Sequence, residues 1–166
     1  NSGQLLINYI GHATVSQWAG EGLFTASDVA GLTNTGKLAI MLPMTCYDGY
    51  FHYPHLYSSG NESVGEVVTR ADAKGAVASW SPSGLGVSTG HDYLDRGFFK
   101  ALFVDGVYTV GQAVLAGKLN LWATSTNLDL LDTYHLFGDP AERFPFHPTS
   151  VEVLSFTGTG TEDANI

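Results

Sequence analysis

Leu38-Ala39-Ile40-Met41-Leu42-Pro43-Met44-Thr45-Cys46 and Leu5-Leu6-Ile7-Asn8-Tyr9-Ile10-Gly11-His12 are the two stretches that decide the fold. Each is a short apolar run that ends at a reactive side chain, a pattern typical of a buried β-strand. Pro43, near the end of the first run, predicts an edge or a bend at that point. An α/β fold places a nucleophile and its base at strand ends, so Cys46 and His12 are the first candidates for chemistry.

The remaining chain alternates predicted helices with short apolar segments. This alternation predicts a parallel sheet covered by helices, in which ligands bind beyond the carboxyl ends of the strands. His12, Cys46 and the loop from Trp80 to Gly90 are therefore expected to meet at one edge of the sheet. The predicted elements are a short helix over 25–32 capped by Thr25 or Ser27, helices over 62–73, 91–104 and 109–123 (the last capped by Thr109), a strand over 75–80 and an apolar segment over 132–137.

Composition narrows the class of protein. The 166 residues suit one domain, and 44% hydrophobic with 14% charged residues describe a globular protein. A net charge of −9 with only seven Lys and Arg argues against nucleic acid as a partner. No apolar run approaches the roughly 18 residues of a membrane helix. The single cysteine excludes a disulfide framework and a multi-cysteine zinc site.

Several candidate residues also have plain structural interpretations. Cys46 is equally consistent with a small buried hydrophobic residue, and His12 with a turn histidine bound to backbone groups. Pro54 breaks the helix that would place His52 and His55 on one face for zinc. Two further pairs of interpretations stay open: Asp92 or Asp95 as a helix cap or as the reader of a basic substrate side chain, and Asn61-Glu62-Ser63 as a glycosylation sequon or a helix cap.

An ordered set of motifs lies at 8–12, Asp28, 32–34, 45–51, 62–66, 75–78 and 134–140. This set resembles the gingipain family of cysteine peptidases. The resemblance extends from Leu5 to Arg143 and includes a separation of 34 residues (46 − 12) between His12 and Cys46. It implies a caspase-like three-layer α/β sandwich with a mostly parallel sheet flanked by helices, whose N-terminal strands are missing from this chain.

The resemblance also implies roles for individual residues. Cys46 would be the nucleophile and His12 the acid/base, with the backbone N–H groups of Cys46 and Ala13 holding the oxyanion. The family usually has glycine where this chain has Ala13, and alanine resists a positive φ. The residues expected to bind substrate are Gly49, Trp80, Ser81 and Ser83.

We predict a cysteine endopeptidase that acts through an acyl-enzyme, with a peptidase-like binding or assembly module of weak or no activity and a sortase-like transpeptidase as alternatives. Residues 1–145 are expected to form part of the catalytic domain, and 146–166 a linker and the start of an immunoglobulin-like β domain. The expected partners are a protein or peptide substrate and the N-terminal part of the same protein or a second processed chain. We expect a secreted or cell-surface location, no catalytic metal site and no required cofactor. The acidic composition is compatible with structural calcium, although no EF-hand spacing is present.

Overall fold

The computed structural model describes residues 3–52 and 62–145. Its main sheet has the strand order β1-β4-β5-β6, formed by β1 (Leu6–Ile10), β4 (Ala39–Met44), β5 (Ala76–Pro82) and β6 (Tyr134–Gly138). The first three strands are parallel, and β6 runs antiparallel to β5. A two-stranded ribbon, β2 (Gln17–Trp18) and β3 (Phe24–Thr25), lies outside this sheet. The predicted mostly parallel sheet is confirmed.

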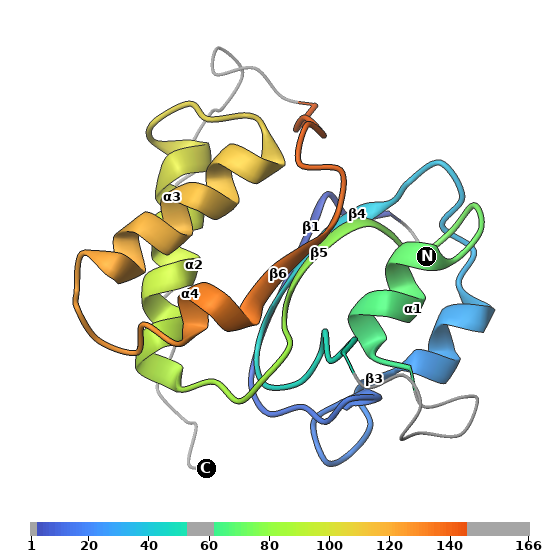
Figure 1. The fold of residues 1–166 in the computed structure, drawn as a ribbon. Coiled ribbons are helices and arrows are strands. Elements are labelled where there is room, and N and C mark those ends of the chain that lie inside the picture. The colour runs from blue at the N-terminus through green and yellow to red at the C-terminus, as the bar shows by residue number, and fades with distance from the viewer. Residues whose placement is uncertain (1–2, 53–61, 146–166) are drawn as a thin grey trace, which may run out of the picture.

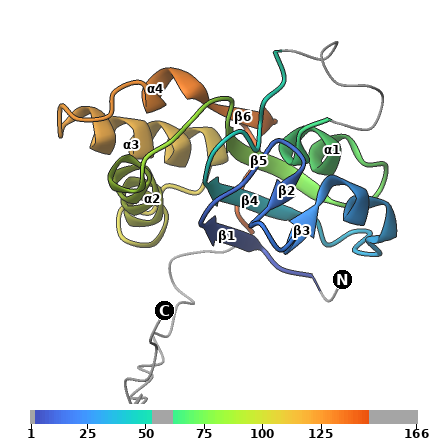
Figure 2. The same ribbon diagram turned by 90° about the horizontal axis from the view of Figure 1, so that it is seen from below.

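Helices cover both faces of the sheet (Figure 1). The long helices α2 (Ser88–Phe103) and α3 (Val110–Trp122) pack together on one face, next to the short α4 (Leu130–Thr133) that leads into β6. The other face carries α1 (Val64–Arg70) and the 3₁₀ helix η1 (Ala26–Gly31). Figure 2 shows the sheet edge-on between these two groups. This arrangement is the predicted three-layer α/β sandwich.

β4 is buried along its whole length because both of its faces are covered. Alternate side chains enter two separate cores: Ile40 and Leu42 pack toward α2 and α3, and Met41 packs toward α1. The expectation that Pro43 marks an edge is therefore wrong, since β4 lies between β1 and β5. Proline is tolerated there because the ladder between β4 and β5 runs only from Ala39 to Met41.

The hydroxyl of Tyr134 lies beyond the point where that ladder ends. It accepts a hydrogen bond from the N–H of Thr45 at 3.3 Å and lies 3.2 Å from the carbonyl oxygen of Pro43. The pKa of Tyr134 is raised well above its ordinary value, chiefly by burial. A neutral side-chain hydroxyl thus satisfies the backbone of β4 where β5 no longer does.

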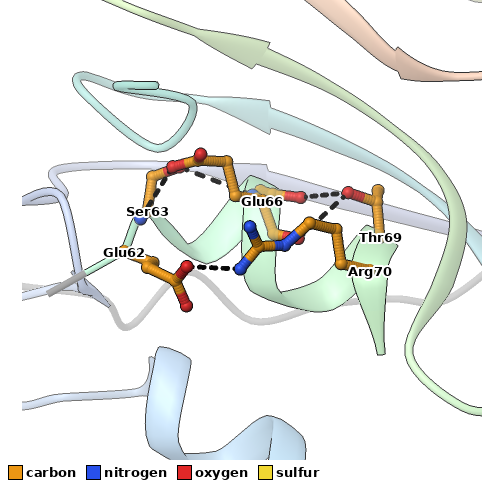
Figure 3. A network of polar contacts seen from close by, with 6 residues as sticks. Glu62, Ser63, Glu66, Thr69 and Arg70 are labelled. Atoms are coloured by element: carbon orange, nitrogen blue, oxygen red, sulfur yellow. Dashed lines mark hydrogen bonds and ion pairs between the residues drawn. The ribbon is translucent and has the colours of Figure 1, made fainter. Parts of the chain in front are cut away.

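The start of α1 is fixed by a capping box (Figure 3). The Ser63 hydroxyl accepts from the N–H of Glu66 at 3.4 Å, and the Glu66 carboxylate accepts from the Ser63 N–H at 3.2 Å. Ser63 of the formal sequon is thus the helix cap, while Asn61 lies outside the described residues. Glu66 is used in this cap, and Arg70 forms its ion pair with Glu62.

Other boundaries differ from the sequence-based expectation. α1 ends at Arg70 and is shorter than the predicted 62–73 helix. Thr25 caps η1 through a second capping box, as predicted, but Thr109 makes no side-chain cap on α3. α2 begins at Ser88 rather than at residue 91, so neither Asp92 nor Asp95 is its cap. Of the helices that the structure describes, none is long and apolar enough to span a lipid bilayer. Residues 146–166 lie outside the described part of the chain.

Candidate active site

The register of the sheet brings His12 and Cys46 to adjacent strand ends. β1 and β4 are parallel, with Ile10 opposite Met44, and each candidate lies two residues beyond this last pair. The backbone pairing continues past the strands, where the N–H of Gly11 donates to the Met44 carbonyl at 3.3 Å. The prediction that both residues follow neighbouring parallel strands at one edge is confirmed.

Cys46 is half-buried and contacts the backbone of the loop that follows β5. The N–H of Gly86 donates to Sγ at 3.3 Å, and Sγ lies 3.7 Å from the Gly86 carbonyl oxygen. A thiolate accepts from the N–H, and a thiol donates to the carbonyl, so Gly86 holds the sulfur in either protonation state. The thiol is therefore a positioned group rather than one facing open solvent.

The turn after Cys46 is tight and strained. Tyr47 has φ +56°, a region in which a bulky side chain is a genuine outlier. Two backbone hydrogen bonds secure the turn against the end of β5: Tyr47 N–H to the Gly84 carbonyl at 2.9 Å and Gly49 N–H to the Pro82 carbonyl at 2.8 Å. Strain that surrounding bonds over-determine is typical of functional sites.

His12 lies in a more exposed loop, where its backbone is held rather than its ring. The His12 carbonyl accepts from the N–H of Ala19 at 2.8 Å and from the Tyr9 hydroxyl at 2.7 Å. Tyr9 in turn stacks on Trp18, with ring centroids 4.5 Å apart and an interplanar angle of 3°. The imidazole itself is exposed to solvent.

The two backbone N–H groups expected to hold an oxyanion belong to Ala13 and Cys46. No described residue accepts a hydrogen bond from the N–H of Ala13 or of Cys46. Ala13 pairs with Trp18 in an isolated antiparallel bridge, and its φ is not left-handed. The alanine therefore fits its backbone conformation without the strain that the comparison with a glycine suggested.

The residues predicted to bind substrate lie inside the protein. The side chains of Trp80 and Ser81 are fully buried, so the expectation that they contact a substrate is wrong. Trp80 packs in the core, with its ring 5.8 Å from that of Phe98. β5 continues to Pro82, so Ser81 lies in a strand rather than in the predicted loop, and Trp80 lies inside the strand rather than at its end.

Ser83 and Gly49 also have internal partners. The Ser83 hydroxyl lies 3.1 Å from both the Thr133 carbonyl oxygen and His135 Nε2. Gly49 is buried, and a Cβ added there would lie 2.6 Å from the Phe137 ring, so close packing explains the glycine. The two residues that flank Gly86 in the chain are exposed instead, Leu85 at 65% and Val87 at 46%.

His91 is a residue near the thiol that the sequence did not single out. It is buried in the first turn of α2, and its Nε2 has no hydrogen-bond partner among the described residues. A Cβ added to Gly86 would lie only 2.0 Å from Nε2, so the imidazole is packed directly against the residue that contacts Sγ. Burial lowers the pKa of His91, outweighing an opposing effect of the Thr45 backbone. The same spacing that places Leu94 and Phe98 inward also places His91 inward.

Asp48 is the second such residue and is fully buried. Its carboxylate accepts from Trp18 Nε1 at 2.5 Å and from the Ser81 hydroxyl at 2.7 Å. Burial raises the pKa of Asp48 to about 6, and the two hydrogen bonds oppose this shift. The carboxylate thus joins the segment after Cys46 to the segment after His12.

The acidic residues proposed as readers of a basic side chain already have partners. Asp92 pairs with Arg96 at 2.8 Å, and Asp95 accepts from the Asn8 amide at 2.9 and 3.1 Å. Burial raises the pKa of Asp95, with a smaller contribution from Asp92. Within 3–52 and 62–145, no group of three or more His, Cys, Asp or Glu side chains is arranged to hold a metal ion. His55, considered with His52 from the sequence and argued against as a zinc ligand, lies outside these ranges.

A sequence model of peptidase family C25 matches residues 1–145, which is most of the chain. The chain belongs to peptidase family C25. The resemblance to the gingipains is thereby confirmed. Lys-gingipain of Porphyromonas gingivalis is 29% identical to this C25 chain over 84% of its length. The chain spans only 9% of that relative, and the same values hold for Lys-gingipain 381.

Solved structures agree with the family. The crystal structure of the Arg-specific cysteine proteinase gingipain R is similar to the C25 chain with a TM-score of 0.73 and 26% identity, covering 85% of this chain and 33% of the other. The complex of the pro- and mature domains of Porphyromonas gingivalis RgpB gives a TM-score of 0.74, also at 26% identity, covering 85% and 34%. The C25 chain therefore has the caspase-like fold of the gingipains over about a third of their solved chains.

Proposed function

We propose that this chain carries the catalytic centre of a cysteine endopeptidase, with Cys46 as the nucleophile and His12 as the acid/base. The parallel register that brings both residues two positions beyond Ile10 and Met44 is the observation that supports this most directly. Membership of family C25 supports the reaction class. His12 takes the thiol proton, Cys46 attacks the scissile carbonyl carbon, and His12 passes the proton to the amine as the C–N bond breaks. Water, deprotonated by His12, then hydrolyses the thioester, and the proton returns to the Cys46 sulfur.

The oxyanion formed in each step needs donors that no other group uses. The N–H groups of Ala13 and Cys46 meet this requirement among the described residues. A peptide seated over them would pass the exposed side chains of Leu85 and Val87. These two residues replace Trp80 and Ser81 as the proposed substrate contacts.

The open edge of β1 supports a proposal about partners. β1 has β4 as its sole neighbour in the described sheet, and an exposed strand edge readily pairs with another strand. We propose that another part of the same protein, or a second processed chain, completes the sheet there. The acidic, lysine-poor composition supports a secreted or cell-surface location.

Peptide hydrolysis by the full-length protein tests the proposed function. Cys46→Ala is expected to lower kcat/KM on a peptide library at least 10³-fold while the circular dichroism spectrum stays unchanged. His12→Ala should lower kcat by a similar factor. Full activity of either variant would contradict the assignment. Added amine nucleophiles distinguish the alternatives, because a transpeptidase gives the amide product and a binding module gives no product.

A further inference from the structure

Trp18 lies between the two segments that carry the proposed dyad. Its indole stacks on Tyr9, whose hydroxyl donates to the His12 carbonyl at 2.7 Å. The backbone of Trp18 bridges to Ala13, and the next residue, Ala19, donates to the same His12 carbonyl at 2.8 Å. The backbone around His12 is therefore shaped by where this indole sits.

The indole N–H is anchored from the other segment. It donates to Oδ1 of Asp48 at 2.5 Å, and Asp48 lies two residues beyond Cys46. Oδ2 accepts from the Ser81 hydroxyl at 2.7 Å, which lies 2.7 Å from the Ser79 hydroxyl. All three of these polar side chains are fully buried. The Asp48 carbonyl also accepts from the N–H of Gly65 at 2.8 Å, which fixes this residue against α1.

We propose that Asp48 is a positioning residue, which acts through Trp18 to hold His12 in register with Cys46. This inference rests on the proposed function, because it assigns Asp48 a role for that same dyad. Among the described residues, the Asp48 carboxylate bonds to Trp18 and Ser81 and to neither candidate side chain, so its effect on chemistry passes through the indole and the His12 backbone.

The contacts also determine which substitutions at position 48 preserve the hydrogen bonds to Trp18 and Ser81. A carboxamide at position 48 accepts from the Trp18 N–H with its oxygen and donates to Ser81 with its nitrogen. The Ser81 hydroxyl then donates to Ser79, which is feasible because either hydroxyl of that pair can be the donor. Protonated Asp48 fits in the same way. Alanine leaves the buried Trp18 N–H and the Ser81 hydroxyl without this acceptor.

The alkylation rate of Cys46 by iodoacetamide, measured by peptide mass spectrometry on the full-length protein from pH 5 to 9, tests the proposal. We expect His12→Ala to slow alkylation near neutral pH. We expect Asp48→Ala to lower the part of the rate that depends on His12 by about tenfold. Asp48→Ala should have no further effect in the His12→Ala background. Asp48→Asn should recover most of the loss. Asp105→Ala, which removes an exposed carboxylate paired with Lys100, is the matched control and should leave the rate unchanged.

Trp18→Phe keeps the stacked ring but removes the N–H, so it should reproduce the effect of Asp48→Ala and guards against misfolding of that variant. Equal slowing by Asp48→Ala with and without His12 would overturn the positioning role, as would an unchanged rate in Asp48→Ala. If His12→Ala alone leaves the rate unchanged, the dyad is wrong and the role of Asp48 falls with it. Slowing by His12→Ala but not by Trp18→Phe overturns only the inference.

Discussion

The two segments that follow β1 and β4 occupy equivalent positions at one edge of the sheet, but they differ in burial and in what holds them. The Cys46 segment is internal: Thr45, Asp48 and Gly49 are buried, and its backbone is bonded to the end of β5. The His12 segment is exposed and depends on the Tyr9–Trp18 stack for its position. The comparison teaches that the proposed nucleophile is fixed by the core. The proposed base is held by backbone contacts from Tyr9 and Ala19, and Trp18 between them is anchored to Asp48 on the nucleophile's side.

The largest expected effect concerns the buried carboxylate that links the two segments. The pKa of Asp48 is about 6 in the folded protein, above its ordinary 3.8. The folded state therefore binds this proton more tightly, and stability is highest below about pH 4 and falls as the pH rises to about 6. The loss amounts to about 3 kcal/mol. Asp48→Asn should remove this slope.

That slope is measured by urea unfolding of the full-length protein and of its Asp48→Asn variant between pH 3.5 and 7.5, with tryptophan fluorescence as the readout. The difference between the two proteins isolates Asp48 from other titrating groups. A constant difference across this range would contradict burial of an ionisable group at the link.

A glycine-to-alanine pair tests whether the Cys46 side is the more rigid one. At Gly86 the new Cβ would lie 2.0 Å from His91 Nε2 and 3.0 Å from the Thr45 carbonyl oxygen. We expect Gly86→Ala to cost about 1–3 kcal/mol of stability and to slow alkylation of Cys46 at least tenfold. Gly20→Ala, in the His12 segment, meets no atom within 4 Å and should change neither quantity.

The clash also predicts a rescue. His91→Ala should restore alkylation in the Gly86→Ala background, because it removes the ring that the new methyl group meets. Equal effects of Gly86→Ala and Gly20→Ala would remove the proposed difference between the two segments.

His91 gives the next effect, with a sign opposite to that of Asp48. Burial lowers the pKa of His91, so the unfolded chain binds this proton more tightly than the folded one. Its contribution to stability is present above about pH 6.5 and is lost as the pH falls toward the lowered folded value. His91→Gln should flatten the acid side of the stability profile, as measured by urea unfolding. An unchanged acid limb would mean that the imidazole is not buried as described.

The smallest effect is expected at Ala13. Its φ is not left-handed, so a glycine relieves no strain there. Ala13→Gly should therefore change kcat/KM for peptide hydrolysis by no more than about threefold. An increase above tenfold would show that the alanine restricts the site, and would favour the weak-activity alternative.

The sequence predicted the sheet and the adjacency of the dyad because these depend on local patterns. Apolar runs locate β1 and β4, and parallel order alone brings His12 and Cys46 to one edge. It failed for Trp80 and Ser81 because the length of β5 is set by pairing with β6, in which Trp80 lies opposite Leu136. No local pattern marks a contact across 56 residues.

The buried polar residues were missed for a related reason. Asp48 acquires its role from Trp18 and Ser81, which lie 30 and 33 residues away in the chain. His91 had a usable signal, since it continues the inward stripe of Leu94 and Phe98, but the start of α2 was placed at His91 itself rather than at Ser88. With the helix starting at Ser88, the helical period predicts that the His91 side chain faces the core.

The early end of the ladder between β4 and β5 affects where the sheet opens locally. Beyond Met41, β4 stays paired with β1 as far as Met44, while toward β5 it relies on the lone hydroxyl of Tyr134. Amide hydrogen exchange should accordingly be asymmetric, with slow exchange where β1 and β4 meet and faster exchange of the Thr45 amide. Opening at this point stays local, because the turn after Cys46 is bonded to the end of β5 through the N–H groups of Tyr47 and Gly49.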